Sequence, residues 1–290
     1  MVAVTIFTPT YNRASLLVKA YNSLKTQTCF DFEWLIIDDG STDNTKSLVD
    51  SFIDEGLINI RYYYQENRGQ YYAHNTAARL AKGELFTFLD SDDAYLEQTV
   101  ERLLFYYNQI RDNSDFAGVA GLKATNCGRI VGGEIDYDIL DCSIIDFRYK
   151  YEYKGDRLEA FKTVLIKENL FPIYEGKFVP NALVWNRISN TLKMRFFSEI
   201  VEYYEWSDTS MSRSIIKNRQ STPDAYLLYY SELSSYSIPL YYKIRASINF
   251  WRFAFYSHVS FKRKVIQIGI WKSFLGLPLG SICYIIDRIR

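Results

Sequence analysis

The sequence lacks the features that mark several common classes of protein. It has only four cysteines in 290 residues, with no paired spacing, which favours a reduced, cytosolic chain over a disulfide scaffold. They are Cys29, Cys127, Cys142 and Cys283. The formal net charge is zero, so nothing global indicates nucleic acid as a partner. No basic stretch precedes the short apolar run at the N-terminus, which argues against a signal peptide.

Internal repeats and low-complexity segments are also missing from the sequence. Hydrophobic residues make up 48% of the chain, which is enough for a large core. The charge, however, is unevenly divided: residues 240–290 sum to +8 and the rest of the chain to −8. We therefore expect the C-terminal segment and the body to face different surroundings.

The first hundred residues alternate between two patterns. Apolar runs predict strands at 2–8, 33–38, 58–64 and 84–90. Apolar residues at helical spacing predict helices at 14–24, from Ser41 onward and at 69–83. Ser41 or Thr42 is the predicted cap of the second helix. Short connections between strands and helices predict an α/β fold, with a Rossmann-like, mostly parallel mixed sheet that is flanked by helices.

The pattern is less regular after residue 93. We predict a helix at 95–112, a strand at 116–124, an irregular stretch at 125–155, helices at 157–166 and 181–193, and basic amphipathic helices from about 243. The predicted domains are 1–225, with halves at 1–95 and 96–225, and a helical basic tail at 226–290.

A polar cluster follows each of the four predicted strands. The clusters are Thr8-Pro9-Thr10-Tyr11, Asp38-Asp39-Gly40-Ser41, Asn67-Arg68-Gly69-Gln70 and Asp90-Ser91-Asp92-Asp93. Since ligands of open parallel sheets bind at the carboxyl ends of the strands, we expect all four clusters at one edge. Tyr11 could lie under a base, and a carboxylate of the second cluster could accept from uracil or ribose. Each cluster taken alone is also explained as a turn or a helix cap.

The stretch FTFLDSDDAYL (86–96) places three carboxylates at the end of an apolar strand, with no Lys or Arg nearby to neutralise them. Such a set is stable if a divalent cation neutralises it, and Mg²⁺ or Mn²⁺ suits oxygen ligands that are completed by water and substrate phosphates. In this Asp-x-Asp motif, one side chain takes the metal while the other reaches a sugar hydroxyl. The alternative is an acidic turn in which Asp93 caps the next helix.

Three segments, in this order and spacing, resemble family 2 glycosyltransferases. They are TPTYNR (8–13), DDGSTDNT (38–45) and NRGQYYAHNTAARLAKGELFTFLDSDD (67–93). The likeness covers residues 2–125 and is weaker beyond. It implies a glycosyltransferase A-type fold and an inverting, metal-dependent enzyme that uses a nucleotide-sugar. The partners that it implies are a UDP-sugar and a glycan or lipid-linked acceptor of bacterial surface-polysaccharide assembly.

The resemblance also implies roles for individual residues. Those that would meet the nucleotide-sugar are Thr8, Pro9, Tyr11, Asp38, Asp39, Arg68, Asn75, Asp90 and Ser91. The first three would line the base pocket, and the two aspartates after the second strand would bind the nucleoside. Asp92, with Asp90, would ligate Mn²⁺ or Mg²⁺ and take part in catalysis. His74 is expected to pack rather than to bind metal.

Inverting transfer needs a base for the acceptor hydroxyl. The resemblance places that acid at the start of a helix, and the matching stretch GKFVPNALVWNRI (176–188) has Asn181 there. An asparagine cannot take the proton. Three explanations stay open: Glu175 is the base, a glutamate of the stretch FSEIVEYYEWSD supplies it (Glu199, Glu202 or Glu205), or the protein binds without turnover.

Residues 265–286 are long enough to span a membrane, but Lys272, Pro278 and three glycines argue against a span. The flanking cations suit a segment that lies on anionic lipid at the inner face of the plasma membrane. An ordinary helical cap over the sheet is the alternative. Two rival functions also remain: a nucleotide-sugar-binding protein without catalysis, and a sugar nucleotidyltransferase, which would need a Gly-rich basic loop after the first strand.

Overall fold

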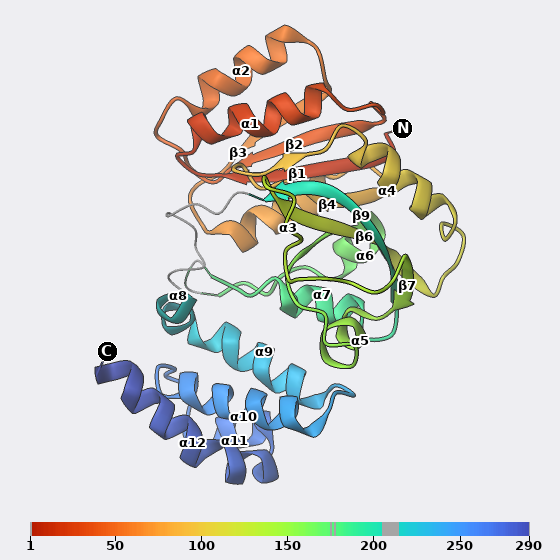
Figure 1. Ribbon diagram of the computed structural model, residues 1–290. Coiled ribbons are helices and arrows are strands. Elements are labelled where there is room, and N and C mark those ends of the chain that lie inside the picture. Colours follow the sequence, from red (N-terminus) through yellow and green to blue (C-terminus); the bar gives the residue numbers. More distant parts are fainter. Residues whose placement is uncertain (1, 175, 177, 205–214, 290) are drawn as a thin grey trace.

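The computed structural model describes residues 2–174, 176, 178–204 and 215–289. Within these residues the chain forms a nine-stranded sheet in the order β3-β2-β1-β4-β8-β6-β9-β5, with β7 paired to β9. Helices cover both faces of the sheet (Figure 1). The predicted α/β class and mixed sheet are confirmed.

The first four strands run parallel and are joined by helices. The elements are β1 (Val4–Thr10), α1 (Ala14–Lys25), β2 (Phe32–Asp38), α2 (Thr45–Glu55), β3 (Ile60–Tyr64), α3 (Gln70–Leu80) and β4 (Leu85–Phe88). Trp34 and Ile36 of β2 pack with α1 and α2, whereas Leu35 and Ile37 pack with α3 on the other face. This burial on both faces explains why the strands are apolar throughout, and the predicted alternation is confirmed.

The second half of the sheet is largely antiparallel. Its strands are β5 (Ala94–Tyr95), β6 (Phe116–Thr125), β7 (Ile139–Cys142), β8 (Arg157–Lys162) and β9 (Lys193–Tyr204). Strand β8 lies between β4 and β6 and pairs antiparallel with both. The helix predicted at 157–166 is therefore wrong over 157–162. The segment is too short for its apolar spacing to distinguish strand from helix, and pairing on both sides decides for the strand.

Several other boundaries differ from the predictions. The remaining helices of the body are α4 (Thr99–Asn108), α5 (Ile144–Tyr149), α6 (Thr163–Glu168), α7 (Ala182–Ile188) and α8 (Ile215–Ser221). Helix α7 is shorter than predicted because β9 begins at Lys193. The predicted caps of α2 are also wrong, since that helix starts at Thr45, whose N–H donates to Asp43 Oδ1 (3.0 Å).

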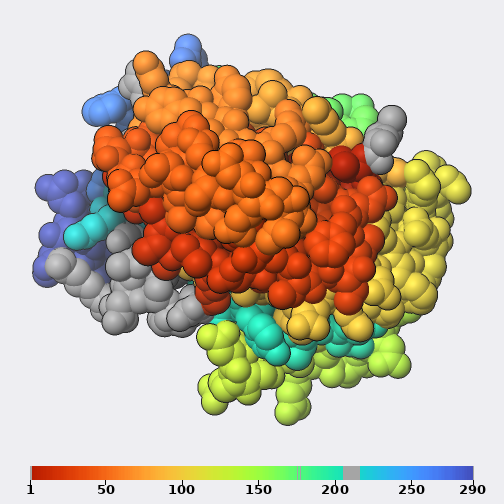
Figure 2. Space-filling view, turned by 90° about the horizontal axis from the view of Figure 1, so that it is seen from above, coloured from red at the N-terminus to blue at the C-terminus, as the bar shows by residue number. Residues whose placement is uncertain are grey.

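Four C-terminal helices form a layer of their own below the sheet (Figure 1). They are α9 (Pro223–Ser235), α10 (Leu240–Ala254), α11 (Phe261–Ile268) and α12 (Ile270–Ile289). Their core includes Leu227, Phe250 and Trp251. Figure 2 looks down from the side of α1 and α2 and shows this layer only at the margin. The division proposed at 225/226 falls within α9 and stays a prediction.

No single helix in the described residues is long and apolar enough to cross a membrane. Helices α11 and α12 reach that length and apolar character only when they are taken together, and they meet at a bend of 115°.

Candidate functional site

The carboxyl ends of β2, β1 and β4 lie side by side, because these strands are parallel neighbours in the sheet. The loops after β1 and β2 are bonded together: the N–H of Asn12 donates to Ser41 Oγ (2.9 Å), and the N–H of Thr42 donates to Asn12 Oδ1 (2.8 Å). Asn12 has a φ of 51°, a conformation that asparagine tolerates better than most residues. We call this part of the molecule, residues 8–13, 38–41 and 90–93, the donor edge.

Arg13 lies against the acidic turn of the donor edge. Its Nη1 donates to Ser91 Oγ (3.2 Å) and stands 3.4 Å from Asp92 Oδ2. Ser91 is buried, so its side chain positions the turn. The expectation that the acidic turn lacks a nearby cation is corrected, since Arg13 reaches it from the loop after β1. This contact could not be predicted from the sequence, because 77 positions separate Arg13 from Ser91.

A second cation, Lys123, reaches the turn from β6. Its Nζ donates to Glu202 Oε1 (2.8 Å) and lies 3.9 Å from Asp93 Oδ2. Burial lowers the pKa of Lys123, but the charges of Glu202, Asp90 and Asp93 outweigh it and raise the pKa above its ordinary value. Lys123 therefore stays charged and balances the carboxylates behind the turn.

Asp90 and Asp92 are the carboxylates of the turn predicted to hold a metal. Asp90 is exposed at the mouth of a cleft, yet burial among the surrounding protein atoms raises its pKa to about 6, with Lys123 opposing the rise. In the described residues no three His, Cys, Asp or Glu side chains converge on a closed metal site. Carboxylate oxygens suit Mg²⁺ or Mn²⁺ when water and substrate phosphates complete the coordination shell of the ion. The carboxylates of Asp90 and Asp92 therefore fit a cation that is shared with a substrate.

A cleft of about 480 Å³ opens beside the donor edge. Its lining includes Pro9, Gln70, His74, Phe88, Asp90, Lys123, Arg148, Asp156, Arg157, Glu159, Pro180, Asn181, Trp185, Arg219 and Tyr229. The structure thus brings Pro9 and Asp90, predicted from the first half of the chain, together with Asn181 from the second. The lining carries both signs of charge, with cations at Lys123, Arg148, Arg157 and Arg219 and acids at Asp90, Asp156 and Glu159.

Asn181 precedes the first turn of α7, as expected for the position of the missing base. Its side chain is exposed and makes no capping hydrogen bond. Two of the alternatives, Glu175 and Glu205, lie outside the described residues. Glu199 lines a separate groove of about 540 Å³, where it accepts from Arg102 and from Tyr106 (2.6 Å). Glu202 has no exposed surface. Neither of these two can meet an acceptor in the large cleft without rearrangement.

Glu159 is a carboxylate of the cleft that sequence reasoning missed. It lies on β8, and Arg148 Nη2 stands 3.9 Å from its Oε1. Burial raises its pKa to about 7, with Arg148 acting against the rise and Asp156 adding to it. It was missed because 157–166 was assigned to a helix. Its place beside the end of β4 follows from the antiparallel pairing of β8 with β4, which the local sequence does not indicate.

Asp38 and Asp39 are both buried and already hydrogen bonded. Asp38 accepts from the N–H of Ser41 (2.7 Å) and from Tyr62 Oη (2.6 Å). Asp39 accepts from Gln65 Nε2 (2.8 Å) and from the N–H groups of Arg68 (3.0 Å) and Gly69 (2.8 Å). Asp39 therefore fixes the loop at the start of α3, and Asp38 closes the turn after β2.

Thr8 and Asn75, which the resemblance expects to meet the nucleotide, are both buried and hydrogen bonded within the protein. The Thr8 hydroxyl donates to the Leu89 carbonyl (2.6 Å) and accepts from Trp34 Nε1 (2.8 Å). Asn75 Nδ2 donates to the Phe171 carbonyl, and the N–H of Phe171 donates to Asn75 Oδ1, both at 2.8 Å. Both side chains support the site from behind.

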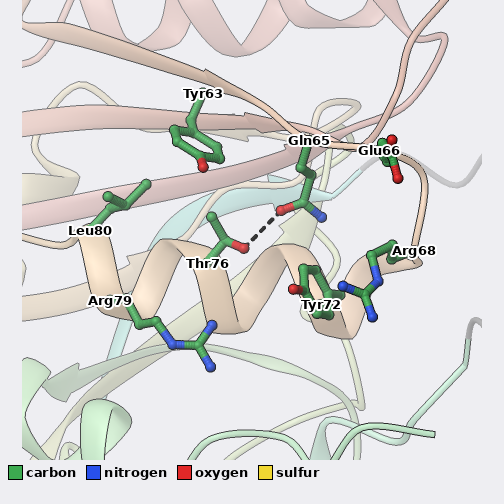
Figure 3. A pocket seen from close by; sticks show the side chains of 8 residues that line it. All are labelled: Tyr63, Gln65, Glu66, Arg68, Tyr72, Thr76, Arg79 and Leu80. Atoms are coloured by element: carbon green, nitrogen blue, oxygen red, sulfur yellow. Dashed lines mark hydrogen bonds between the residues drawn. The ribbon is translucent and has the colours of Figure 1, made fainter.

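Tyr11 and Arg68 remain accessible near the donor edge. Tyr11 is 48% exposed. The Arg68 guanidinium lies 4.0 Å from the centre of the Tyr72 ring, at one end of a groove of about 370 Å³ between β3 and α3. Figure 3 shows this groove, which the hydrogen bond between Thr76 and Gln65 crosses. Arg68 lines this groove and not the large cleft.

His74 packs among aromatic rings, as predicted. Its ring centre lies 4.8 Å from that of Phe7, 5.2 Å from that of Phe88 and 5.3 Å from that of Phe171. Burial lowers its pKa to about 3, so the imidazole is neutral at physiological pH and forms part of the apolar floor of the cleft.

Comparison with protein families gives a match to the model described as glycosyl transferase family 2 over residues 5–123. Residues 5–123 are therefore similar to family 2 glycosyl transferases. The match begins in β1 and ends in β6, so the matched segment contains the donor edge and Lys123, whereas Glu159 and Asn181 lie beyond it.

Curated relatives match the same part of the chain. An uncharacterized glycosyltransferase from Nostoc sp. is 34% identical over 116 residues, which is 40% of this chain and 35% of that protein. Glycosyltransferase GlyG from Streptococcus pneumoniae is 34% identical over 110 residues, covering 38% of this chain and 35% of that protein. The chain thus matches about a third of the length of these relatives.

Solved structures share the fold over almost the whole chain. S. aureus TarS 1–349, solved with UDP-GlcNAc, has a TM-score of 0.69 at 17% identity, covering 98% of this chain and 89% of that one. A mannosyltransferase from Pyrobaculum calidifontis, solved with GDP-Man and Mn²⁺, has a TM-score of 0.60 at 16% identity, covering 98% and 87%. These likenesses show the glycosyltransferase A-type fold, which confirms the predicted fold type.

Proposed function

We propose that the protein is an inverting, metal-dependent glycosyltransferase that moves a sugar from a UDP-linked donor to a glycan or lipid-linked saccharide acceptor. The observation that carries this proposal is the acidic turn of Asp90 and Asp92 at the mouth of the large cleft, beside the ends of β1 and β2. The nucleotide-sugars bound by TarS and by the mannosyltransferase support a nucleoside diphosphate donor.

On this proposal the donor edge holds the nucleotide-sugar. Tyr11 and Pro9 contact the base, and Asp39 fixes the loop that carries Arg68. Asp90 meets the donor sugar or ribose, and Asp92, with Asp90, holds Mn²⁺ or Mg²⁺. A bound divalent cation offsets the charge that develops on the departing diphosphate. The loops of the site are held in place by the hydrogen bonds described above, which involve Thr8, Asp38, Asn75 and Ser91.

Glu159 is the base that the cleft supports best. Its carboxylate accepts the proton of the acceptor hydroxyl as that oxygen bonds to the anomeric carbon. The bond from this carbon to the diphosphate breaks, and its electron pair leaves with the nucleoside diphosphate. A pKa of about 7 suits a general base near neutral pH. Asn181 can orient the same hydroxyl by hydrogen bonding, although its amide cannot take the proton.

A protein that binds nucleotide-sugars without turnover is the second candidate, and Asn181 is the observation that favours it.

We also propose that the sugar transfer takes place in the cytoplasm, during the assembly of surface polysaccharide. An acceptor held by a lipid carrier would bring the basic tail to an anionic membrane, which is the setting developed in the next subsection.

Donor binding and turnover can be measured separately. We expect UDP-sugars to raise the melting temperature more than GDP- or dTDP-sugars, and sugar release to require Mn²⁺ or Mg²⁺. Asp92→Ala should keep the fold and lose the metal-dependent part of donor binding, because one carboxylate ligand is gone. Glu101→Ala, an exposed acid on α4, is the matched control and should behave as wild type.

The opposite results decide against the proposal. A clear preference for GDP or dTDP would overturn the UDP assignment, and undiminished metal-dependent binding in Asp92→Ala would refute the metal role. Donor binding without any release of sugar would favour the binding protein.

A further inference from the structure

Helix α12 packs against α10 through its small residues. Ser273, Gly276 and Gly280 are its buried positions. A Cβ at Gly276 would lie 2.2 Å from Ser247 Oγ, and one at Gly280 would lie 2.6 Å from Trp251 Cβ. The two backbones therefore approach closely, as in the small-residue contacts of helices in membranes.

Most of the large apolar side chains of α12 are consequently exposed, whereas Leu277 packs against the core of the C-terminal helices. Trp271 is 83% exposed, Phe274 78% and Ile289 80%. We define the apolar face as these three residues together with Ile266, Ile270, Leu275, Leu279, Ile282, Ile285 and Ile286, all of which are exposed. A helix of a water-soluble protein normally buries its large apolar residues, and a continuous exposed patch of this kind marks an interaction surface.

The charges beside the apolar face are basic. Asp287 is the only acidic residue in 240–290, and it is paired with Arg252 (Nη2 to Oδ1, 2.5 Å), with its side chain only 4% exposed. Lys262 and Arg263 are exposed at the start of α11, and Arg288 is exposed near the end of α12. The apolar face therefore has exposed cations at both ends, and the acid of this segment is neutralised within the protein.

The packing of the two helices also limits how they can meet a bilayer. Helix α11 meets α12 at 115°, and buried Ile268 belongs to the same core as Phe250 and Trp251 of α10. The small-residue side of α12 is occupied by α10. One side of the pair is thus held by protein while the other is apolar and basic, which is the arrangement of helices that lie in a membrane interface.

We infer that the apolar face of α11 and α12 docks the protein on a membrane rich in anionic phospholipid. The apolar side chains enter the boundary between headgroups and acyl chains, and Lys262, Arg263 and Arg288 meet the lipid phosphates. Tyr226 and Tyr229 of α9 line the large cleft, and α9 packs against α10. Docking would thus hold the cleft near a lipid-linked acceptor, a consequence that rests on the proposed function.

The test is co-sedimentation of the full chain with vesicles, without donor. One set contains phosphatidylcholine alone, and the other contains equal parts of phosphatidylcholine and phosphatidylglycerol. We expect binding to the anionic vesicles that weakens with salt. Trp271→Ser with Phe274→Ser should weaken it about tenfold or more, because two large apolar side chains no longer leave water. Lys262→Glu with Arg263→Glu should remove the preference for phosphatidylglycerol.

Phe30→Ser is the matched control, because Phe30 is a similarly exposed phenylalanine (55%) in the loop before β2, and it should bind as wild type. Circular dichroism and thermal melting check that each variant is folded. A folded wild type that ignores both vesicle types, or binds them equally, would overturn the inference. A dimer that Trp271→Ser with Phe274→Ser dissociates, without vesicle binding, would show that a second copy covers the face. Because no donor or turnover is involved, these outcomes are separate from those that test the enzyme.

Discussion

Along the donor edge, polar side chains are bonded to one another, whereas Glu159 of β8 and Asn181 of α7, which line the cleft beside it, make fewer such bonds. Asp39 accepts hydrogen bonds from three groups, and Arg13 joins Ser91 to Asp92. Asn181, in contrast, makes no capping bond, and Glu159 stands 3.9 Å from Arg148. Groups held in place before a ligand arrives reduce the ordering that binding requires. The donor edge is thus preorganised, and under the proposed function Glu159 and Asn181 would be available to an acceptor.

The largest expected effect comes from the less constrained side. Glu159→Gln should lower kcat about 10²–10⁴-fold, the usual contribution of a general base, and leave donor affinity nearly unchanged. Because the base must be deprotonated, wild-type kcat/KM should fall as the pH drops below about 7, the pKa of Glu159. Steady-state kinetics across pH and UDP binding by calorimetry measure the two effects.

Substitutions at two other positions provide controls for Glu159. Glu199→Gln removes a carboxylate from the other groove and should leave the pH profile unchanged. Asn181→Glu restores an acid at the start of α7 and should recover part of the activity of Glu159→Gln. If Glu159→Gln turns over normally while Asn181→Glu gains activity, Glu159 is not the base, and the comparison between the two sides of the cleft must be redrawn.

A second prediction concerns how the two regions are joined. Asn75 on α3 bonds both backbone groups of Phe171. Asn75→Ala should lower the free energy of unfolding by about 1–3 kcal/mol for each backbone group left unpaired. Chemical denaturation measures this loss, with Asn169→Ala as a control because that partly buried side chain bonds only a local carbonyl. Unchanged stability together with weaker UDP binding would return Asn75 to the nucleotide site.

The sequence predicted that the polar clusters share one edge of the sheet, because local signals specify the strands that they follow. Apolar strands followed by polar clusters determine a parallel sheet, and its topology brings Asp39 and Asp92 to one edge. What could not be predicted depends on distant pairing. Arg13 and Lys123 reach the acidic turn only after folding, and β8 becomes a strand because β4 and β6 pair with it. Glu159 was missed for that reason. For Thr8 and Asn75, the sequence could not distinguish hydrogen bonding within the protein from contact with a ligand, since the same polar residue can do either.

The smallest predicted effects distinguish a donor-edge residue that supports the structure from one that contacts the nucleotide. Thr8→Val leaves the Trp34 N–H and the Leu89 carbonyl without their partner, so stability should fall by about 1–3 kcal/mol while UDP affinity is retained in the folded fraction. Tyr11→Ala removes a half-exposed ring and should do the reverse, weakening UDP binding by about 1–3 kcal/mol through lost stacking with little change in melting temperature. Denaturation and calorimetry on both variants give the comparison. If Thr8→Val weakened UDP binding as much as Tyr11→Ala, Thr8 would contact the base directly, and the donor edge would have to open when the nucleotide binds.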